Sequence, residues 1–320
     1  MERTFFWLLA AGLGVPALML TVVRLVDSDV GTMIRVESFT PLGIPLYAAL
    51  LLLMAFGVMR RPAGQRTRRV VGAFVALAGL VLHGWWFAPQ VMGDNPAPAA
   101  GAPRITVMTA NLFAGLGDAD DVVEAVRRDH VDILVLEEIT PTALDRLDAA
   151  GLAQLLPHRI GSPDPDVAGT MVFSNQRMGE PALLATQFPS HRVQVGTLTL
   201  LAVHPVAPVL PQTWRRDHDL IRNEAVDQHA DLIVGDLNAT PDHEVMRELE
   251  DAGFRDAGEL ANEGWQPTWP ANHVGLFARL PPLVRIDHVL VAPTLASLGT
   301  HTVDIRGSDH LALVATVARR

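Results

Sequence analysis

The stretch Asp231-Leu-Ile-Val-Gly-Asp-Leu-Asn238 joins a short apolar run to two polar side chains. Short apolar runs bounded by turn-forming residues favour buried strands. Residues two apart in an extended chain face the same side, so Asp236 and Asn238 can converge on one water molecule. Gly235 leaves room for a neighbouring backbone to approach closely. The stretch therefore predicts a buried strand that ends in a polar site.

Similar apolar runs recur on both sides of this stretch and alternate with amphipathic segments. The predicted strands are 105–110, 132–136, 170–174, 195–203, 231–234, 286–291 and 311–317. The predicted helices are 120–129, 142–155, 213–229 and 242–252, the last opened by Thr240 as N-cap with Pro241 after it. This mixture predicts a layered α/β or α+β enzyme.

Polar residues follow almost every predicted strand. They are Asn111, Glu138, His204, Asp236 with Asn238, Asp287, and Asp309 with His310. A single Asp or Asn after a strand is most often a turn residue, because its side chain bonds to the local backbone. A whole series in one domain instead predicts a shared site. Carboxylate and amide oxygens without cysteine favour Mg²⁺ or Mn²⁺ over a structural zinc.

Charge is distributed unevenly along the chain. The first 100 residues contain 8 Arg and 5 acidic residues, so the remaining 220 contain 17 Arg and 30 acidic residues and carry a formal charge of −13. Such a domain repels a polyanion, and we expect no specific nucleic-acid partner. The absence of cysteine excludes disulfides and thiolate nucleophiles. The sequence also lacks a Gly-rich phosphate loop of the common nucleotide-binding types.

Three apolar runs near the N-terminus are long enough to span a bilayer: about 5–26, 42–59 and 70–88. A cleaved signal peptide is the alternative for the first run, but its charged flank is short and two further runs follow. Residues 1–92 are therefore predicted to be a membrane anchor. Residues 93–103, rich in Pro, Ala and Gly, are predicted to be a linker, and 104–320 the catalytic domain.

The segment 60–69 between the second and third runs contains five Arg and no acidic residue. Short basic loops stay in the cytoplasm. This places the N-terminus in the cytoplasm and the catalytic domain outside, in a multi-pass protein of the cell membrane. We therefore expect the lipid bilayer to be a binding partner of the chain.

Six blocks of the sequence resemble the endonuclease/exonuclease/phosphatase superfamily, which includes deoxyribonuclease I. The blocks contain Asn111, Glu138, His204, Gly235-Asp-Leu-Asn238, Arg285-Ile-Asp287-His288 and Ser308-Asp309-His310. The resemblance implies a four-layer α/β sandwich and Mg²⁺-dependent (or Mn²⁺-dependent) phosphoester hydrolysis. Two positions depart from the family pattern, Glu137 in place of Gln and Leu237 in place of an aromatic residue. Strand alternation turns one acid of the 137–138 pair away from the site, and the resemblance favours Glu138 as the metal ligand.

The resemblance also implies a role for each polar residue. Glu138, Asn111 and Asp309 would hold the metal, with Asn111 also near the phosphate. Asp236 would deprotonate the attacking water, and Asn238 would fix that water. Asp287 would orient His310, and His204 and His310 would contact phosphate oxygens as imidazolium donors. The segment Thr268-Trp269-Pro270 occupies the place of a substrate loop, although a packed Trp fits equally well. The histidines at 218, 229, 243, 273 and 301 are predicted to lie at the surface.

The order of three spans and a small catalytic domain is similar to VanJ-type membrane proteins of actinobacteria, which are associated with glycopeptide resistance. This similarity implies a membrane lipid as substrate, with undecaprenyl pyrophosphate as the first candidate. An outward-facing nuclease and a sphingomyelinase-like phospholipase remain as alternatives within enzymes. A catalytically inactive binding module is the alternative outside them.

Overall fold

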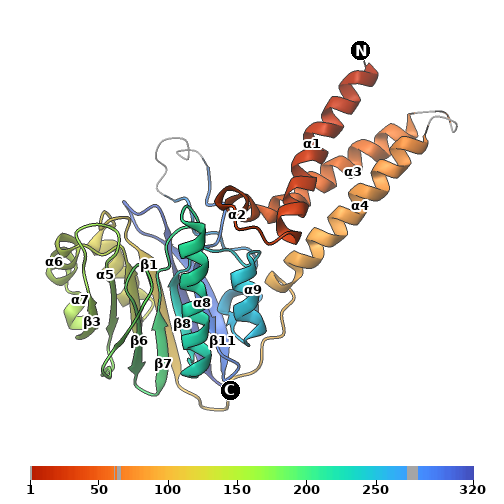
Figure 1. Ribbon diagram of the computed structural model, residues 1–320. Helices are drawn as coiled ribbons and strands as arrows, with labels where there is room; N and C mark the ends of the chain where they lie inside the picture. The colour runs from red at the N-terminus through yellow and green to blue at the C-terminus, as the bar shows by residue number, and fades with distance from the viewer. Residues whose placement is uncertain (1, 61, 63–65, 272–279) are drawn as a thin grey trace. The chain divides into compact units, whose positions relative to one another are not determined.

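The computed structural model describes residues 2–60, 62, 66–271 and 280–320. The chain divides into two compact units, Met1–Pro89 and Gln90–Arg320 (Figure 1). Part of the basic 60–69 segment and His273 lie outside the described residues.

The first unit is helical, as the apolar runs predict. Its elements are α1 (Glu2–Leu25), α2 (Gly31–Glu37), the 3₁₀ turn Thr40–Leu42, α3 (Gly43–Met59) and α4 (Thr67–Phe87), with a last 3₁₀ turn at Ala88–Gln90. Three helical segments, Thr4–Leu25, Thr40–Met59 and Thr67–Gln90, are long and apolar enough to span a membrane. The prediction of three apolar N-terminal helices is confirmed.

Close packing and one polar cluster join these three helices. Gly79 faces the Tyr47 ring so tightly that a Cβ would lie 2.4 Å from it, as small residues allow at helix contacts in lipid. Thr21 bonds to both the Tyr47 hydroxyl (2.8 Å) and His83 Nε2 (3.0 Å). His83 Nδ1 lies 3.0 Å from the carbonyl oxygen of Thr40. His83 therefore serves the packing of the helices.

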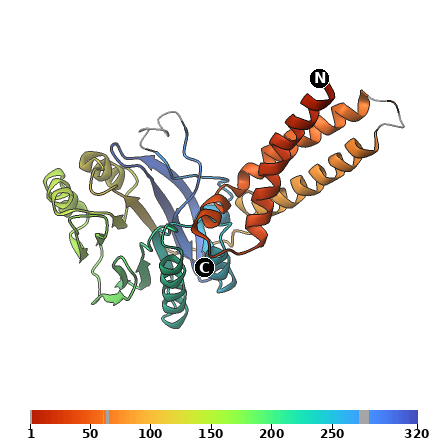
Figure 2. The same ribbon diagram turned by 45° about the horizontal axis from the view of Figure 1, so that its top comes forward.

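The second unit contains two six-stranded sheets (Figures 1 and 2). The first has the order β11-β12-β1-β2-β4-β3 and the second β5-β6-β7-β8-β10-β9. The strands of the first sheet are β1 (Arg104–Asn111), β2 (Ile133–Glu137), β3 (His158–Ser162), β4 (Thr170–Ser174), β11 (Leu295–Asp304) and β12 (Leu311–Arg319). Those of the second are β5 (Ala182–Leu184), β6 (Ser190–Val195), β7 (Leu198–Ala202), β8 (Leu232–Asp236), β9 (Arg255–Asp256) and β10 (Asp287–Val291).

Helices cover the outer face of each sheet. They are α5 (Ala119–Arg128), α6 (Pro141–Ala150) and α7 (Leu152–Leu155) on the first sheet, and α8 (Pro211–Asp227) and α9 (Glu244–Asp251) on the second, with the short α10 (Ala257–Leu260) after β9. Side chains alternate along β1: Met108 packs with Val122 of α5, whereas Val107 packs between the sheets with Val234. The result is the four-layer sandwich that the sequence predicts.

Several predicted boundaries were wrong for local reasons. The strand expected at 195–203 is a hairpin, because Gly196 (φ +58°) begins a turn between β6 and β7. The helix expected at 142–155 breaks at Gly151 (φ +101°) into α6 and α7. The helix expected from Thr240 begins only at Glu244, since the Thr240 amide donates to His243 Nδ1 (2.7 Å) and closes a separate turn.

The segment predicted as a linker hydrogen-bonds to the second unit. Asn95 donates to the carbonyl of Ser297 (2.8 Å), and the Ala99 amide donates to that of Arg319 (2.9 Å). Gln90 donates to Glu259 (2.5 Å) and accepts from the Gly264 amide (2.9 Å). Backbone bonding to the second unit thus begins at Gln90.

Candidate active site

The polar residues of the site continue the rows of side chains that fill the gap between the sheets. Residues 107 and 109 of β1 precede Asn111 on the same face, and 232 and 234 of β8 precede Asp236. Asp287 begins β10 opposite Asp236, with which it is paired across the sheet. One end of both sheets therefore gathers these side chains. We call it the site end, and it contains the last residues of β1, β2, β7 and β8.

Asp236 lies at the centre of the cluster and is 1% exposed. Its Oδ2 accepts a hydrogen bond from Asn111 Nδ2 (3.1 Å) and lies 3.8 Å from the Nε2 atoms of both His204 and His310. Burial raises the pKa of Asp236 to about 7, with a further contribution from Asp287 and an opposing one from His310. Asp236 therefore combines a buried position with the proton affinity that a general base needs near neutral pH.

His310 is held by Asp287, as the sequence predicts. The Nδ1 atom of His310 lies 2.8 Å from Asp287 Oδ2, and both side chains are buried. Burial alone would lower the pKa of His310, but the carboxylates of Asp287 and Asp236 outweigh it and raise the pKa to about 10. His310 is therefore an imidazolium at neutral pH, pointing its Nε2 at Asp236.

His204 differs from His310, although both were expected to be imidazolium donors. His204 is 2% exposed, and the ring of Phe188 lies 5.0 Å from its own. Burial, together with the charge of His310, lowers the pKa of His204 to about 3. This low pKa favours a neutral imidazole at His204, in contrast to the imidazolium at His310.

The two acids at the end of β2 point to different places. Glu137 is fully buried and accepts a hydrogen bond from Thr109 Oγ1 (2.8 Å). Burial, then repulsion from Asp287, raises the pKa of Glu137 well above its usual value. Glu138 is partly exposed, and its two oxygens accept from Asn111 Nδ2 (3.2 Å) and from the Ala114 amide (2.7 Å). The Asn111 side chain thus bonds to the carboxylate of Glu138, whereas Glu137, its neighbour across the strands, bonds to Thr109.

Asp309 is positioned by residues to which the sequence analysis gave no definite role. Trp269 Nε1 donates to Asp309 Oδ2 (3.1 Å), so this Trp holds a site residue. Thr268 Oγ1 accepts from the Asp287 amide at 3.4 Å. Ser308 Oγ donates to the Asn111 carbonyl (2.7 Å) and accepts from the His310 amide (2.9 Å). The position of Ser308 directly before Asp309 and His310 was the only sequence signal for such a role.

A buried aromatic cluster supports Asn238, which has a left-handed φ of +49°. The Asn238 amide donates to Asp236 Oδ1 (2.8 Å), and its side chain donates to the Pro205 carbonyl (3.1 Å). Trp214 Nε1 donates to the Asn238 carbonyl (3.0 Å). His218 and His243 pack against Trp214 and are buried, so their predicted surface positions were wrong. His229 and His301 are exposed, as predicted.

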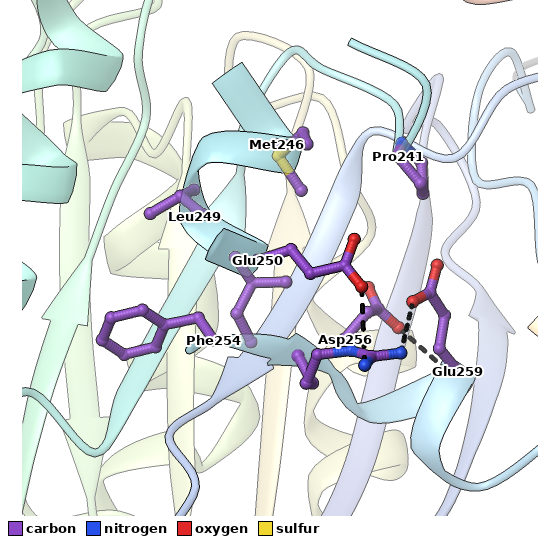
Figure 3. Close-up of a pocket in the computed structure, with 9 residues that line it drawn as sticks. Pro241, Met246, Leu249, Glu250, Phe254, Asp256 and Glu259 are labelled. Atoms are coloured by element: carbon purple, nitrogen blue, oxygen red, sulfur yellow. Dashed lines mark hydrogen bonds and ion pairs between the residues drawn. The ribbon is translucent and has the colours of Figure 1, made fainter. Parts of the chain in front are cut away.

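A cluster of ion pairs lies next to the loop that follows Asp236 (Figure 3). His288 bridges the Ala239 carbonyl (2.9 Å) and Asp256 (2.7 Å), and Asp256 lies 3.5 Å from buried Arg285. Figure 3 shows Glu250, Asp256 and Glu259 gathered beside a small cavity. Its volume of about 20 Å³ admits roughly one water molecule. The cavity is too small for substrate, and the cluster serves to fix the loop that follows Asp236.

The donor set fits a divalent cation. Glu138 and Asp309 repel each other enough that Asp309 contributes to a raised pKa of Glu138, after burial, which is the main cause. Asp287 Oδ1 is buried without a hydrogen-bond partner in the described part of the chain. The ligand atoms of Asp236, Asp287 and His310 also lie within 4.8 Å of one another. Because His310 Nδ1 already bonds to Asp287, the oxygens of Glu138, Asn111 and Asp309 suit a hard cation better.

Solved structures share this fold. An AP endonuclease from Archaeoglobus fulgidus has a TM-score of 0.55 at 14% identity, covering 66% of this chain and 98% of its own. A 3′ phosphatase from Neisseria, bound to product DNA hairpin, has 0.55 at 20% identity, with coverage of 66% and 98%. A humanized TDP2 from D. rerio has 0.51 at 14% identity, with coverage of 67% and 98%.

No curated protein sequence matches the chain. The model of the Endonuclease/Exonuclease/phosphatase family matches residues 108–310, which begin in β1 and end at His310. This span includes Asn111, Glu138, Asp236, Asp287 and His310. With the fold, the converging side chains and this match in agreement, the chain belongs to the Endonuclease/Exonuclease/phosphatase family.

Proposed function

We propose that this chain is a membrane-anchored, metal-dependent phosphoesterase that hydrolyses a membrane lipid phosphate or pyrophosphate, with undecaprenyl pyrophosphate as the first candidate. One observation carries the proposal. A buried Asp236, bonded to Asn111 and facing two histidines, occurs in the same chain as three helices that are apolar and long enough to span a bilayer. Phosphoester chemistry and access to lipid are thereby combined in one molecule.

Glu138, Asn111 and Asp309 would hold Mg²⁺ in this proposal, with Mn²⁺ as a substitute. When bound, the cation supplies positive charge to the phosphate and its leaving oxygen. Hydrogen bonds within the protein orient two of these ligands. Asn111 Nδ2 and the Ala114 amide fix the carboxylate of Glu138, and Trp269 fixes that of Asp309.

Asp236 would take a proton from the attacking water, because its raised pKa makes the carboxylate a competent base near pH 7. The Asn238 amide holds Asp236 Oδ1 and leaves Oδ2 facing the histidines. His310, charged and held by Asp287, would donate to a non-bridging phosphate oxygen and stabilise the charge of the transition state. Neutral His204, whose Nε2 lies 3.8 Å from the same Asp236 Oδ2, would donate or accept a hydrogen bond there.

Lipid is favoured over nucleic acid by charge and by the apolar helices. The 101–320 segment carries a formal charge of −13, which disfavours gathering of DNA. The five Arg of segment 60–69 support a cytoplasmic N-terminus and a catalytic unit outside the cell membrane. Undecaprenyl pyrophosphate on that side, and a link to glycopeptide resistance, are proposed from the order of three apolar runs and a small catalytic domain, which resembles VanJ-type proteins.

The test is a substrate panel for the full-length protein in lipid vesicles with Mg²⁺. The panel contains undecaprenyl pyrophosphate, a phospholipid, sphingomyelin and duplex DNA, and each reaction is scored by its product. We expect release of inorganic phosphate from the polyprenyl lipid at a much higher rate than DNA cleavage. The Asp236→Asn protein is the control for contaminating phosphatases.

A nuclease is the second candidate, because the Neisseria 3′ phosphatase with the same fold was solved with a DNA hairpin. Ready cleavage of DNA with every lipid phosphate left intact would replace our proposal by the nuclease. Inactivity on every substrate, with an intact fold, would favour the inactive binding module.

A further inference from the structure

Two loops at the site end expose apolar side chains beside the polar site. Residues 113–117 follow β1, and residues 205–210 follow β7. Phe113 is 37% and Leu116 60% exposed on the first loop, and Val209 is 62% and Leu210 53% exposed on the second. We call these four residues the rim. The loops follow strands of different sheets, so the rim has members on both sides of the gap that ends in Asp236.

The rim loops contain no charged residue, although they belong to a segment with a formal charge of −13. Scattered exposed apolar side chains are ordinary, whereas apolar groups gathered around a functional site mark a binding surface. Exposing four large apolar side chains to water on two short loops next to carboxylates is unfavourable. Contact with the hydrocarbon of a bilayer would remove these side chains from water.

The first loop displays its apolar side chains at a conformational cost. Phe113 (φ +48°) and Ala114 (φ +50°) are consecutive left-handed residues other than glycine. Such residues are strained and persist only where their surroundings fix them. Here the Phe113 amide donates to Asn111 Oδ1 (2.9 Å) and the Ala114 amide to Glu138 (2.7 Å). The candidate metal ligands therefore hold the loop in place.

The second loop is fixed to the opposite part of the site. Asn238 donates to the carbonyl of Pro205, and Val206 is buried beneath the loop. Pro205, Pro208 and Pro211 restrict the backbone around Val209 and Leu210. Both loops are thus rigid supports that connect apolar tips to catalytic groups.

We infer that the rim docks the catalytic unit on the hydrocarbon boundary of the bilayer and brings the lipid headgroup to Asp236. This inference rests on the proposed function. The chain itself supplies the reason to choose a bilayer as the occupant. Only Ala88 and Pro89 separate the end of α4 from Gln90, which is already bonded to the second unit. The three Cα–Cα steps from Phe87 to Gln90 span at most roughly 11 Å, so a bilayer that holds the candidate spans lies within reach of that unit.

Contact with lipid can be measured without any catalytic assay. The natural chain contains no cysteine, so a single introduced cysteine carries one environment-sensitive fluorophore. We would label Leu116→Cys and Val209→Cys in the full-length protein, reconstituted in phosphatidylcholine and phosphatidylglycerol nanodiscs with nitroxide-labelled lipid. Val226→Cys and Leu298→Cys are matched controls, since both are exposed apolar residues near the ends of α8 and β11 that lie away from the site.

The rim labels should be quenched by the nitroxide lipid and shifted to shorter emission wavelengths, and the control labels should not. Equal quenching at rim and control positions would overturn the docking surface. Leu116→Ser combined with Val209→Ser should also lower hydrolysis of vesicle-borne polyprenyl pyrophosphate on the order of tenfold or more, because burial of apolar side chains is lost. Turnover of soluble para-nitrophenyl phosphate should be unchanged, as should both activities of Val226→Ser.

The outcomes separate this inference from the proposed function. Quenched rim labels in a protein that hydrolyses no lipid phosphate leave the docking surface in place and refute the proposed substrate. Lipid hydrolysis with unquenched rim labels refutes the docking surface and supports the substrate.

Discussion

Gly235 is the position where the smallest change should have the largest effect on the site. It precedes Asp236 and has a φ of +150°, in the range that side-chain-bearing residues rarely adopt. An added Cβ would lie 1.9 Å from the carbonyl oxygen of Val203, just after the neighbouring strand β7, and 3.0 Å from Glu137 Oε1. Because contacts below 3.0 Å are not tolerated, the ends of β7 and β8 would have to separate by about 1.1 Å.

The cost of Gly235→Ala follows from three contributions. A φ of this kind costs about 1–3 kcal/mol for alanine. Forcing the packed ends of β7 and β8 apart costs about 1–3 kcal/mol. The Val203 amide donates to the Val234 carbonyl at 2.9 Å, and losing this hydrogen bond costs about 1 kcal/mol. The sum, about 3–7 kcal/mol, is a large part of the 5–15 kcal/mol that typically stabilises a domain.

Activity should fall as well, because the same displacement separates His204 from Asp236, now 3.8 Å apart. A misplacement of about 1 Å at reacting groups costs on the order of 100-fold in rate. The assays are urea unfolding of the full-length protein in detergent, followed by tryptophan fluorescence, and hydrolysis of the preferred substrate.

Gly253→Ala is the matched control. Gly253 also has a positive φ (+99°), but its added Cβ would meet only Pro293, at an ordinary 3.4 Å. We expect the free energy of unfolding of this variant to fall by about 1–2 kcal/mol and its activity to be unchanged. If Gly235→Ala is as stable and as active as Gly253→Ala, the close approach of Val203 to Gly235 does not exist and the reasoning fails.

Three further predictions concern the metal, a buried acid and the orientation. Excess EDTA should abolish hydrolysis, and Glu138→Gln and Asp236→Asn should each reduce it on the order of 100-fold or more; full activity in EDTA would exclude the metal. Because the pKa of Glu137 is raised in the folded state, its contribution to stability is complete at low pH and is lost as pH rises above 4.5. Glu137→Gln should therefore gain thermal stability relative to the natural protein as pH increases from 4 to 8, and a pH-independent difference would contradict this. Alkaline phosphatase fused after Pro103 should be active and fused after Arg61 inactive, since the basic segment 60–69 is predicted to be cytoplasmic; the reverse result would invert the topology.

Strand alternation made much of the site accessible from sequence. The apolar residues at 232 and 234 precede Asp236 on one face, so the row that fills the core also points Asp236 toward the gap between the sheets. The edge strands lack this signal. β3 (His158–Ser162) is half exposed with mixed polarity, and β5 has only three residues. Each pairs with the next strand along the chain, β3 with β4 and β5 with β6, and this pairing defines them, since they show no alternation of their own.

The supporting residues were missed because their partners come from other elements. Trp214 on α8 donates to the carbonyl of Asn238, and His288 on β10 hydrogen-bonds to the carbonyl of Ala239. His218 and His243 were placed at the surface because they lack the spacing of metal ligands, but both pack against the buried indole of Trp214. The Trp214–His218 contact is an i, i+4 pair within α8, so helix spacing could have indicated it, whereas the Trp214–His243 contact joins two elements and has no such signal.

The choice between Glu137 and Glu138 shows what strand ends add to the pattern. Alternation continues to Glu137, which lies in the same inward row as Ile133 and Val135 and is buried. The next residue leaves the pattern, because Glu138 has a left-handed φ of +53°. Asn238 has the same conformation (φ +49°) just beyond the end of β8. At both positions a candidate site residue other than glycine ends the extended conformation. Hydrogen bonds from the Ala114 amide to Glu138 and from the Asn238 amide to Asp236 offset the strain. The site is therefore built where the β pattern stops, and the residues that stop it are those proposed to hold the metal and the water.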